Sequence, residues 1–159
     1  MTTDSKRRLF LKGSLITGLL TLAASLGLLA PIRALAAWPA TAFDAKKVDT
    51  ALNTLFGNSN LIDRSADITL TAPDLAENGA VVPVTVQSTL EGIESITLLV
   101  DKNPNALVAR FNLAKNAQPY IKTNIKMAET SNLIAVLKAG DRLYSTSIKV
   151  KVTLNGCGN

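Results

Sequence analysis

The residue best placed for chemistry is Cys157, the only cysteine among 159 residues, which has a glycine on each side. Glycine has no Cβ and samples both signs of φ, so this segment predicts a flexible arm that presents a thiol. An extended residue spans about 3.3 Å, so the sulfur could stand ~10 Å beyond a strand that ends at Leu154. The predicted arm is residues 155–159, and its other members are Asn155, Gly156, Gly158 and Asn159.

The rest of the composition argues against an enzyme. The chain has no histidine, which excludes Ser-His-Asp and Cys-His arrangements and also imidazole sites for zinc or copper. Glu91 and Glu94 could form a carboxylate pair near a turn, but a solvated loop edge is the favoured interpretation. We therefore predict no catalytic residue, no metal site and no resident cofactor.

Three interpretations of Cys157 remain at this point. At the reference thiol pKa of about 8.5 only a few per cent is thiolate at neutral pH, which suits a carrier thiol that visiting enzymes activate. Covalent attachment of a cargo is therefore favoured. The alternative is an exported immunoglobulin-like interaction module whose tail cysteine forms an intermolecular disulfide. The third interpretation is a cysteine without a role, although an exposed thiol is a liability in an oxidising compartment.

Residues 1–36 have the features of an export signal. An uncharged stretch from Gly13 to Ile32 follows a basic segment, and a small-x-small pattern predicts cleavage between Ala36 and Ala37. The basic segment resembles the twin-arginine signal, with Lys6 in place of the usual hydroxyl residue. The matching residues are Arg7, Arg8, Phe10, Leu11 and Lys12. We expect export of the folded protein to the periplasm without a stable membrane anchor.

The net charge of +5 is concentrated in this leader. Five of the 17 Lys and Arg and one of the 12 Asp and Glu lie in residues 1–36, so residues 37–159 carry about +1. A nearly neutral domain lacks the basic footprint that nucleic acid binding requires. We therefore expect no nucleic acid partner.

Residues 37–154 are predicted to form one domain, a helix followed by strands. A capping pattern begins at Thr41, with Asp44 three residues on, and Gly57 is a suitable stop for the helix. After it the hydrophobic period changes to two, which indicates strands with one buried face. About seven such strands predict an immunoglobulin-like β-sandwich, with a small barrel as the alternative. The expected strands are 68–72, 82–88, 96–100, 107–113, 120–127, 132–138 and 143–154.

Together, the leader, the helix-then-sandwich order and the cysteine arm resemble SoxY, the sulfur-carrier subunit family of the thiosulfate-oxidising SoxYZ complex. The arm of that family is usually Gly-Gly-Cys-Gly-Gly. Gly156, Cys157 and Gly158 match this pattern, whereas Asn155 and Asn159 replace its outer glycines.

The resemblance implies that Cys157 is the attachment site for sulfur oxidation intermediates. It also implies a heterodimer with a SoxZ-like β-sandwich subunit. A c-type cytochrome pair would load thiosulfate, a hydrolase would release sulfate, and in some organisms a sulfur dehydrogenase would oxidise the remaining sulfur.

Overall fold

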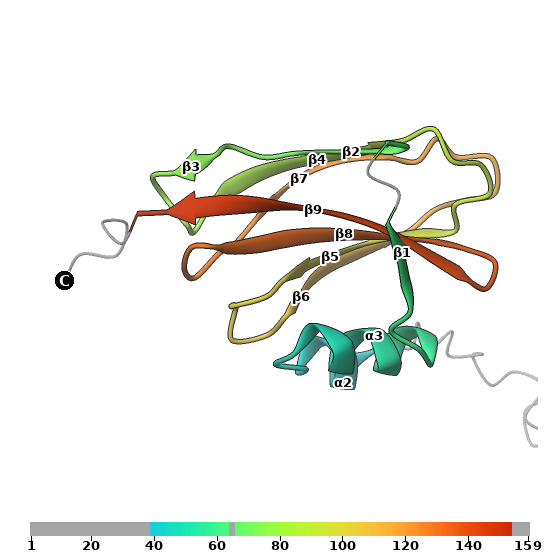
Figure 1. The fold of residues 1–159 in the computed structure, drawn as a ribbon, viewed down its shortest axis with the longest axis horizontal. Coiled ribbons are helices and arrows are strands. Elements are labelled where there is room, and N and C mark those ends of the chain that lie inside the picture. The colour runs from blue at the N-terminus through green and yellow to red at the C-terminus, as the bar shows by residue number, and fades with distance from the viewer. Residues whose placement is uncertain (1–38, 64–65, 154–159) are drawn as a thin grey trace, which may run out of the picture. The chain divides into compact units, whose positions relative to one another are not determined.

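The structure, a computed structural model, describes residues 39–63 and 66–153, and this part of the chain is mainly β (Figure 1). Two short helices come first among the described residues, α2 (Ala40–Phe43) and α3 (Val48–Phe56). Nine strands follow in the same part of the chain: β1 (Leu61–Asp63), β2 (Ile68–Thr71), β3 (Leu75–Ala76), β4 (Val82–Ser88), β5 (Ser95–Val100), β6 (Leu107–Asn112), β7 (Tyr120–Ile125), β8 (Ser131–Ala139) and β9 (Arg142–Val152).

The strands form two sheets. The large sheet has the order β1-β9-β8-β5-β6, and β3 also pairs with β9. The small sheet has the order β2-β4-β7. All of these pairs are antiparallel except that β1 and β3 run parallel to β9. Gly140, at φ 55°, lies in the tight turn between β8 and β9, where a positive φ favours glycine.

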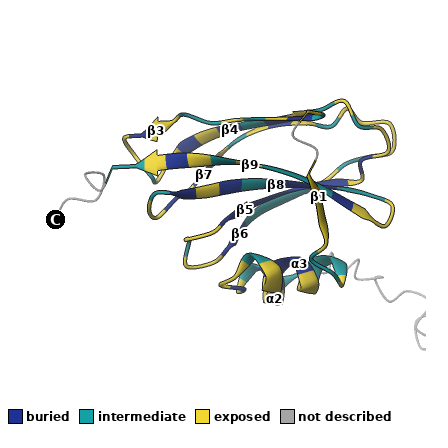
Figure 2. Ribbon diagram, in the orientation of Figure 1, coloured by how far each residue is buried: buried dark blue, intermediate teal, exposed yellow. Residues whose placement is uncertain are grey.

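The core between the sheets follows from the alternation of apolar and polar residues. Val82, Val84 and Val86 of β4 are buried, and the residues between them are exposed or half-buried (Figure 2). They lie in one hydrophobic cluster with Leu98 and Leu133 of the large sheet. Because each fully buried side chain of this kind contributes about 1.5–3 kcal/mol, this cluster holds the two sheets together.

The helices form a third layer. Figure 1 shows α2 and α3 on the face of the large sheet opposite the small sheet. All six residues of β5 are buried, because one face of the strand meets the small sheet and the other meets the helices. Leu99 of β5 lies in a second cluster with Leu52 of α3, Val136 of β8 and Leu143 of β9.

The mainly β sandwich predicted from the sequence is confirmed, and each of the seven predicted strands is present. Their bounds differ by a few residues at most: β8, for example, is Ser131–Ala139 rather than 132–138. The sequence pattern missed β1 and β3, which have three and two residues. Strands this short do not show a periodicity that could be recognised.

The predicted single helix beginning at Thr41 is wrong. Thr41 lies inside α2, whose N-cap position is Pro39, and α2 ends with Asp44 at its C-cap. The break before α3 leaves the carbonyl of Ala45 free to accept a hydrogen bond of 2.8 Å from Ala106 N, far away in the sequence. Gly57 does end α3, in the left-handed conformation at φ 74°.

Candidate functional site

Strand β9 connects the sandwich to the sequence around Cys157. It pairs with β8 from Arg142 to Val150, opposite Ala139 to Ser131. Beyond Val150 the strand continues without a β8 partner, and Figure 1 shows it ending at the same side of the molecule as β3. The described residues stop at Thr153, which is four residues before Cys157 in the sequence.

An apolar hollow of about 460 Å³ lies beside the end of β9. Its lining is mainly small or apolar, with three longer polar residues among the ten: Asn78, Gly79, Ala80, Asn103, Pro104, Lys126, Met127, Ala128, Val152 and Thr153. Gly79 permits the close packing here, because a Cβ at this position would collide with the Met127 carbonyl oxygen and lie 2.8 Å from Val152 Cγ1. The last residues of β9 therefore form part of the wall of this hollow.

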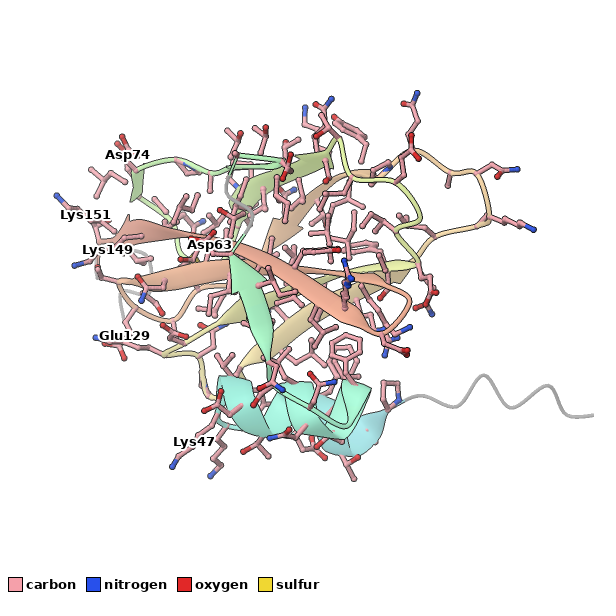
Figure 3. The ribbon with its side chains drawn as sticks, turned by 45° about the vertical axis from the view of Figure 1, so that its right-hand side comes forward. Lys47, Asp63, Asp74, Glu129, Lys149 and Lys151 are labelled. Carbon is pink, nitrogen blue, oxygen red and sulfur yellow. The ribbon has the colours of Figure 1, made fainter. Side chains whose placement is uncertain are left out.

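Charged side chains of both signs surround the end of β9. Figure 3 shows Asp74 and Glu129 on the same side of the molecule as Lys149 and Lys151. These four labelled side chains, two acids and two bases, offset one another in charge.

The family of sulfur oxidation protein SoxY matches residues 52–157, which is more than half of the chain and extends to the cysteine. The chain belongs to the SoxY family. A solved structure supports the same assignment: the sulfur carrier protein SoxY from Chlorobium limicola f thiosulfatophilum is 37% identical. That alignment covers 68% of this chain and 97% of the other, with a TM-score of 0.61.

Two further comparisons add nothing to this assignment. A chain from a structure on T cell specificity and activation by the bacterial superantigen toxic shock syndrome toxin-1 is 12% identical, with a TM-score of 0.40. The alignment covers 54% of this chain and 99% of that one, and similarity this low does not indicate a shared fold or function. The comparison with curated proteins found no match.

The residues predicted to act in SoxY chemistry lie outside the described residues. This holds for Cys157 and its neighbours Asn155, Gly156, Gly158 and Asn159, and for the cleavage residues Ala36 and Ala37. It also holds for Arg7, Arg8, Phe10, Leu11 and Lys12 of the export signal. These assignments stay predictions, as do the domain boundaries at residues 36 and 154.

The carboxylates considered as a possible pair do not form an acid–base site. Glu94 makes an ion pair with Lys138 of β8, and its side chain is 54% exposed. The hydrogen bond and the charge of Lys138 lower the pKa of Glu94 below 4.5, which keeps this group a carboxylate at neutral pH. A general acid would require a shift in the opposite direction.

The described residues also lack two other features. Over residues 39–63 and 66–153, no three His, Cys, Asp or Glu side chains gather where they could hold a metal ion. No helix in the described part of the chain is long and apolar enough to cross a membrane.

Sequence reasoning missed the residues that hold the end of β9. Thr130 and the residues around β3 contact this end across long sequence separations, as described below. Pro73, directly before this segment, indicated only that the preceding strand ends. No local signal in the sequence identifies which residue a lone threonine will contact in the fold.

Proposed function

We propose that this SoxY-family protein is a periplasmic carrier that holds thiosulfate-derived intermediates covalently on Cys157 and presents them to partner enzymes. The observation that carries the proposal is the family match, which extends to Cys157 itself. The geometry is compatible with it, because β9 is anchored as far as Thr153 and Cys157 follows only four residues later. The 37% identical relative is described as a sulfur carrier protein, which supports the same role.

The chemistry at the thiol can be written as a balanced step. The sulfur of Cys157 and the outer sulfur of thiosulfate form a sulfur–sulfur bond, and the thiol proton is released. This oxidation yields two electrons, which a c-type cytochrome pair accepts. Water then cleaves the terminal sulfonate in a hydrolase, which releases sulfate and two protons and leaves a persulfide anion on the cysteine. A sulfur dehydrogenase can oxidise that remaining sulfur further.

In this proposal the protein holds the cargo but does not catalyse its conversion. The chain has no histidine that could act as a base for the thiol. Each visiting enzyme therefore has to supply the group that activates the cysteine or cleaves the adduct. This division explains how one carrier can serve enzymes with different chemistry.

The partner and the location belong to the same proposal. We propose a heterodimer with a SoxZ-like β-sandwich subunit, as the family resemblance implies. The twin-arginine-like residues Arg7 and Arg8, with Phe10 close behind, support export of the folded protein to the periplasm. A SoxZ-like subunit without its own leader could be exported together with this chain.

The proposed function can be tested by moving the thiol. Cys157→Ser in a thiosulfate-oxidising cell should abolish thiosulfate-dependent respiration, because no sulfur atom remains to hold the cargo. As a matched control, Ser147→Cys in the same background restores a thiol on an exposed residue of β9 but not at position 157. We expect this double variant to stay inactive.

Two results would contradict the carrier function. One is continued respiration by the Cys157→Ser variant. The other is a stoichiometric covalent dimer of freshly isolated protein on non-reducing electrophoresis, which would favour the disulfide-linked interaction module.

A further inference from the structure

The last residues of β9 lie beyond its main pairing partner. Ser131 opposite Val150 is the last β8–β9 pair, so residues 151–153 have no β8 backbone beside them. A strand end of this kind would ordinarily fray, since its backbone groups lose their ladder partners. Here, three sets of contacts replace the missing ladder.

The first set comes from β3, which runs parallel to the end of β9. Lys151 N donates to the carbonyl of Asp74 at 2.9 Å, and Thr153 N donates to the carbonyl of Ala76 at 3.1 Å. Leu75 between them is 51% exposed, so β3 adds little apolar burial through this side chain. Ala76, the other residue of β3, is buried in the core cluster, so β3 both pairs with the end of β9 and attaches it to the core.

The second set comes from side-chain hydroxyls. Thr130 directly precedes β8, and its Oγ1 accepts a hydrogen bond of 3.0 Å from Val152 N. The same hydroxyl lies 3.4 Å from the Val152 carbonyl and donates to it. Thr153 Oγ1 donates to the carbonyl of Glu77 at 3.1 Å. The Thr130 side chain thereby continues the β8 side of the ladder by one position.

The third set is packing. Gly79 lies close to both Met127 and Val152, and its carbonyl accepts a hydrogen bond of 2.7 Å from Met127 N. With these contacts, each backbone N–H from residue 151 to residue 153 has a partner: Asp74, Thr130 and Ala76 in turn. Contacts from three separate places in the sequence thus hold the backbone after Val150 in place as far as Thr153.

We infer that Thr130, Thr153 and the segment 74–77 are positioning residues which fix the end of β9, to which the predicted arm of residues 155–159 is connected. This inference gains its functional meaning from the proposed carrier role of Cys157. From Thr153 the cysteine is four residues away, a reach of at most ~13 Å. If the strand opened back to Val150, seven residues would separate them, and the reach would rise to ~23 Å.

The contacts of Thr130, Thr153 and the segment 74–77 with the end of β9, which we call the clamp, affect delivery of the cysteine as well as its reach. The effective concentration of a tethered group falls roughly as the −3/2 power of tether length or more steeply. A fixed exit point with a short tether therefore presents the cysteine to a docked partner in a small volume. Loosening the clamp enlarges that volume without removing the thiol.

Spin labelling can test the inference because Cys157 is the only cysteine. Lys122→Cys places a second label on an exposed position of β7, so that the distance between the two labels can be measured. Thr130→Val combined with Thr153→Val removes both hydroxyls and keeps the side-chain shape. We expect a broader distance distribution, with distances extended by up to ~10 Å.

Loss of a hydrogen bond should also speed amide exchange of residues 151–153 by about fivefold or more.

The matched control is Thr130→Ser with Thr153→Ser, which keeps both hydroxyls. This variant should give the wild-type distances and exchange rates. A Val variant with unchanged distances and unchanged exchange would overturn the inference. If the Val variant does not fold, exchange in the wild-type chain still decides: residues 151–153 must be protected nearly as well as Ile148 and Val150, and rapid exchange there contradicts the clamp.

The two proposals can fail separately. The distances and exchange rates report the clamp in the isolated chain, whether or not the cysteine carries sulfur. In the complete thiosulfate-oxidising system, the Val variant should lower turnover several-fold, whereas Cys157→Ser should abolish it. Altered distances together with unchanged turnover would overturn the functional meaning of the clamp but leave the carrier role intact.

Discussion

The first end of β9 packs in the helix-facing cluster through Leu143, whereas the last residues of the strand lie beyond the β8 ladder. Leu143, at the first end, is 2% exposed and packs in the cluster with Leu52 and Val136. At the other end Lys151 is exposed, Val152 is half-buried, and backbone and hydroxyl hydrogen bonds hold the strand.

Each end also has a short parallel partner. β1 pairs with Leu143–Ser145, and β3 pairs with residues 151 and 152. Because apolar burial ties the first end to the whole fold, disturbing it should lower global stability. The second end is held by contacts that can open locally, so disturbing it should change position more than stability. This difference separates the part of β9 that is tied to the folded core from the part that, in our inference, positions the arm.

The largest effect is expected from Leu143→Ala, which removes a buried side chain from the helix-facing cluster. The free energy of unfolding should fall by about 2–4 kcal/mol, as for other leucine truncations in cores. Denaturant unfolding measures this. Ile62→Ala on the neighbouring strand β1 is the control, because Ile62 is 43% exposed and its truncation should cost much less. Equal losses for the two variants would contradict the comparison.

A smaller loss is expected from Gly79→Ala, at the other end of β9. The new Cβ would collide with the Met127 carbonyl oxygen and press on Val152, so the two segments must separate. Such overpacking costs about 1–3 kcal/mol. Denaturant unfolding gives the stability, and amide exchange should locate the disturbance at residues 151–153. Ala80→Ser, at the exposed neighbouring residue, should leave both measurements unchanged.

Thr97→Val should raise the stability of the fold rather than lower it. Thr97 is fully buried in β5, and its Oγ1 has no hydrogen-bond partner among residues 39–63 and 66–153. Replacing this hydroxyl by a methyl group removes an unsatisfied polar atom without changing the shape, so stability should rise by about 1 kcal/mol. Thr97→Ser is the matched variant, because it keeps the hydroxyl and loses a methyl group. A destabilised Val variant would show that the hydroxyl has a partner in solution.

The smallest effect concerns pH and the exposed pair of Glu94 with Lys138. The pair lowers the pKa of Glu94 in the folded state below the unfolded-state pKa of 4.5. The pair therefore stabilises the fold fully above pH 4.5, and this stabilisation is lost as the pH falls through the folded-state pKa of Glu94. Below pH 4.5 the melting temperature of the wild type should therefore fall slightly more than that of Glu94→Gln. Glu91→Gln is the charge-matched control. Parallel pH curves for wild type and Glu94→Gln would contradict the prediction.

Alternation along the chain was sufficient to predict the seven longer strands. The pattern in Val82–Ser88 is an example, because each inward valine alternates with a more exposed residue. Alternation does not specify the partners, so the order β1-β9-β8-β5-β6 could not be derived from it. At the break between α2 and α3, the Ala45 carbonyl accepts a hydrogen bond from Ala106 N, a long-range contact that no local pattern encodes.

The candidate site also has a part that the sequence alone predicts and a part that only the fold shows. A lone cysteine between glycines is a local feature, and the sequence alone was sufficient to propose its role. The clamp depends on Thr130, Thr153 and the segment 74–77, which meet only in the folded chain. A threonine before a strand has many possible partners, so its contact with Val152 could not be predicted.

The central claim is that Cys157 carries the sulfur, and peptide-level mass spectrometry tests it most directly. Protein isolated from cells oxidising thiosulfate should show sulfur-containing adducts on the peptide with Cys157, and reductant should remove them. The Cys157→Ser protein, and the same protein with Ser147→Cys, should carry none. Unmodified Cys157 during active thiosulfate oxidation, or equal loading of a cysteine at position 147, would contradict the account.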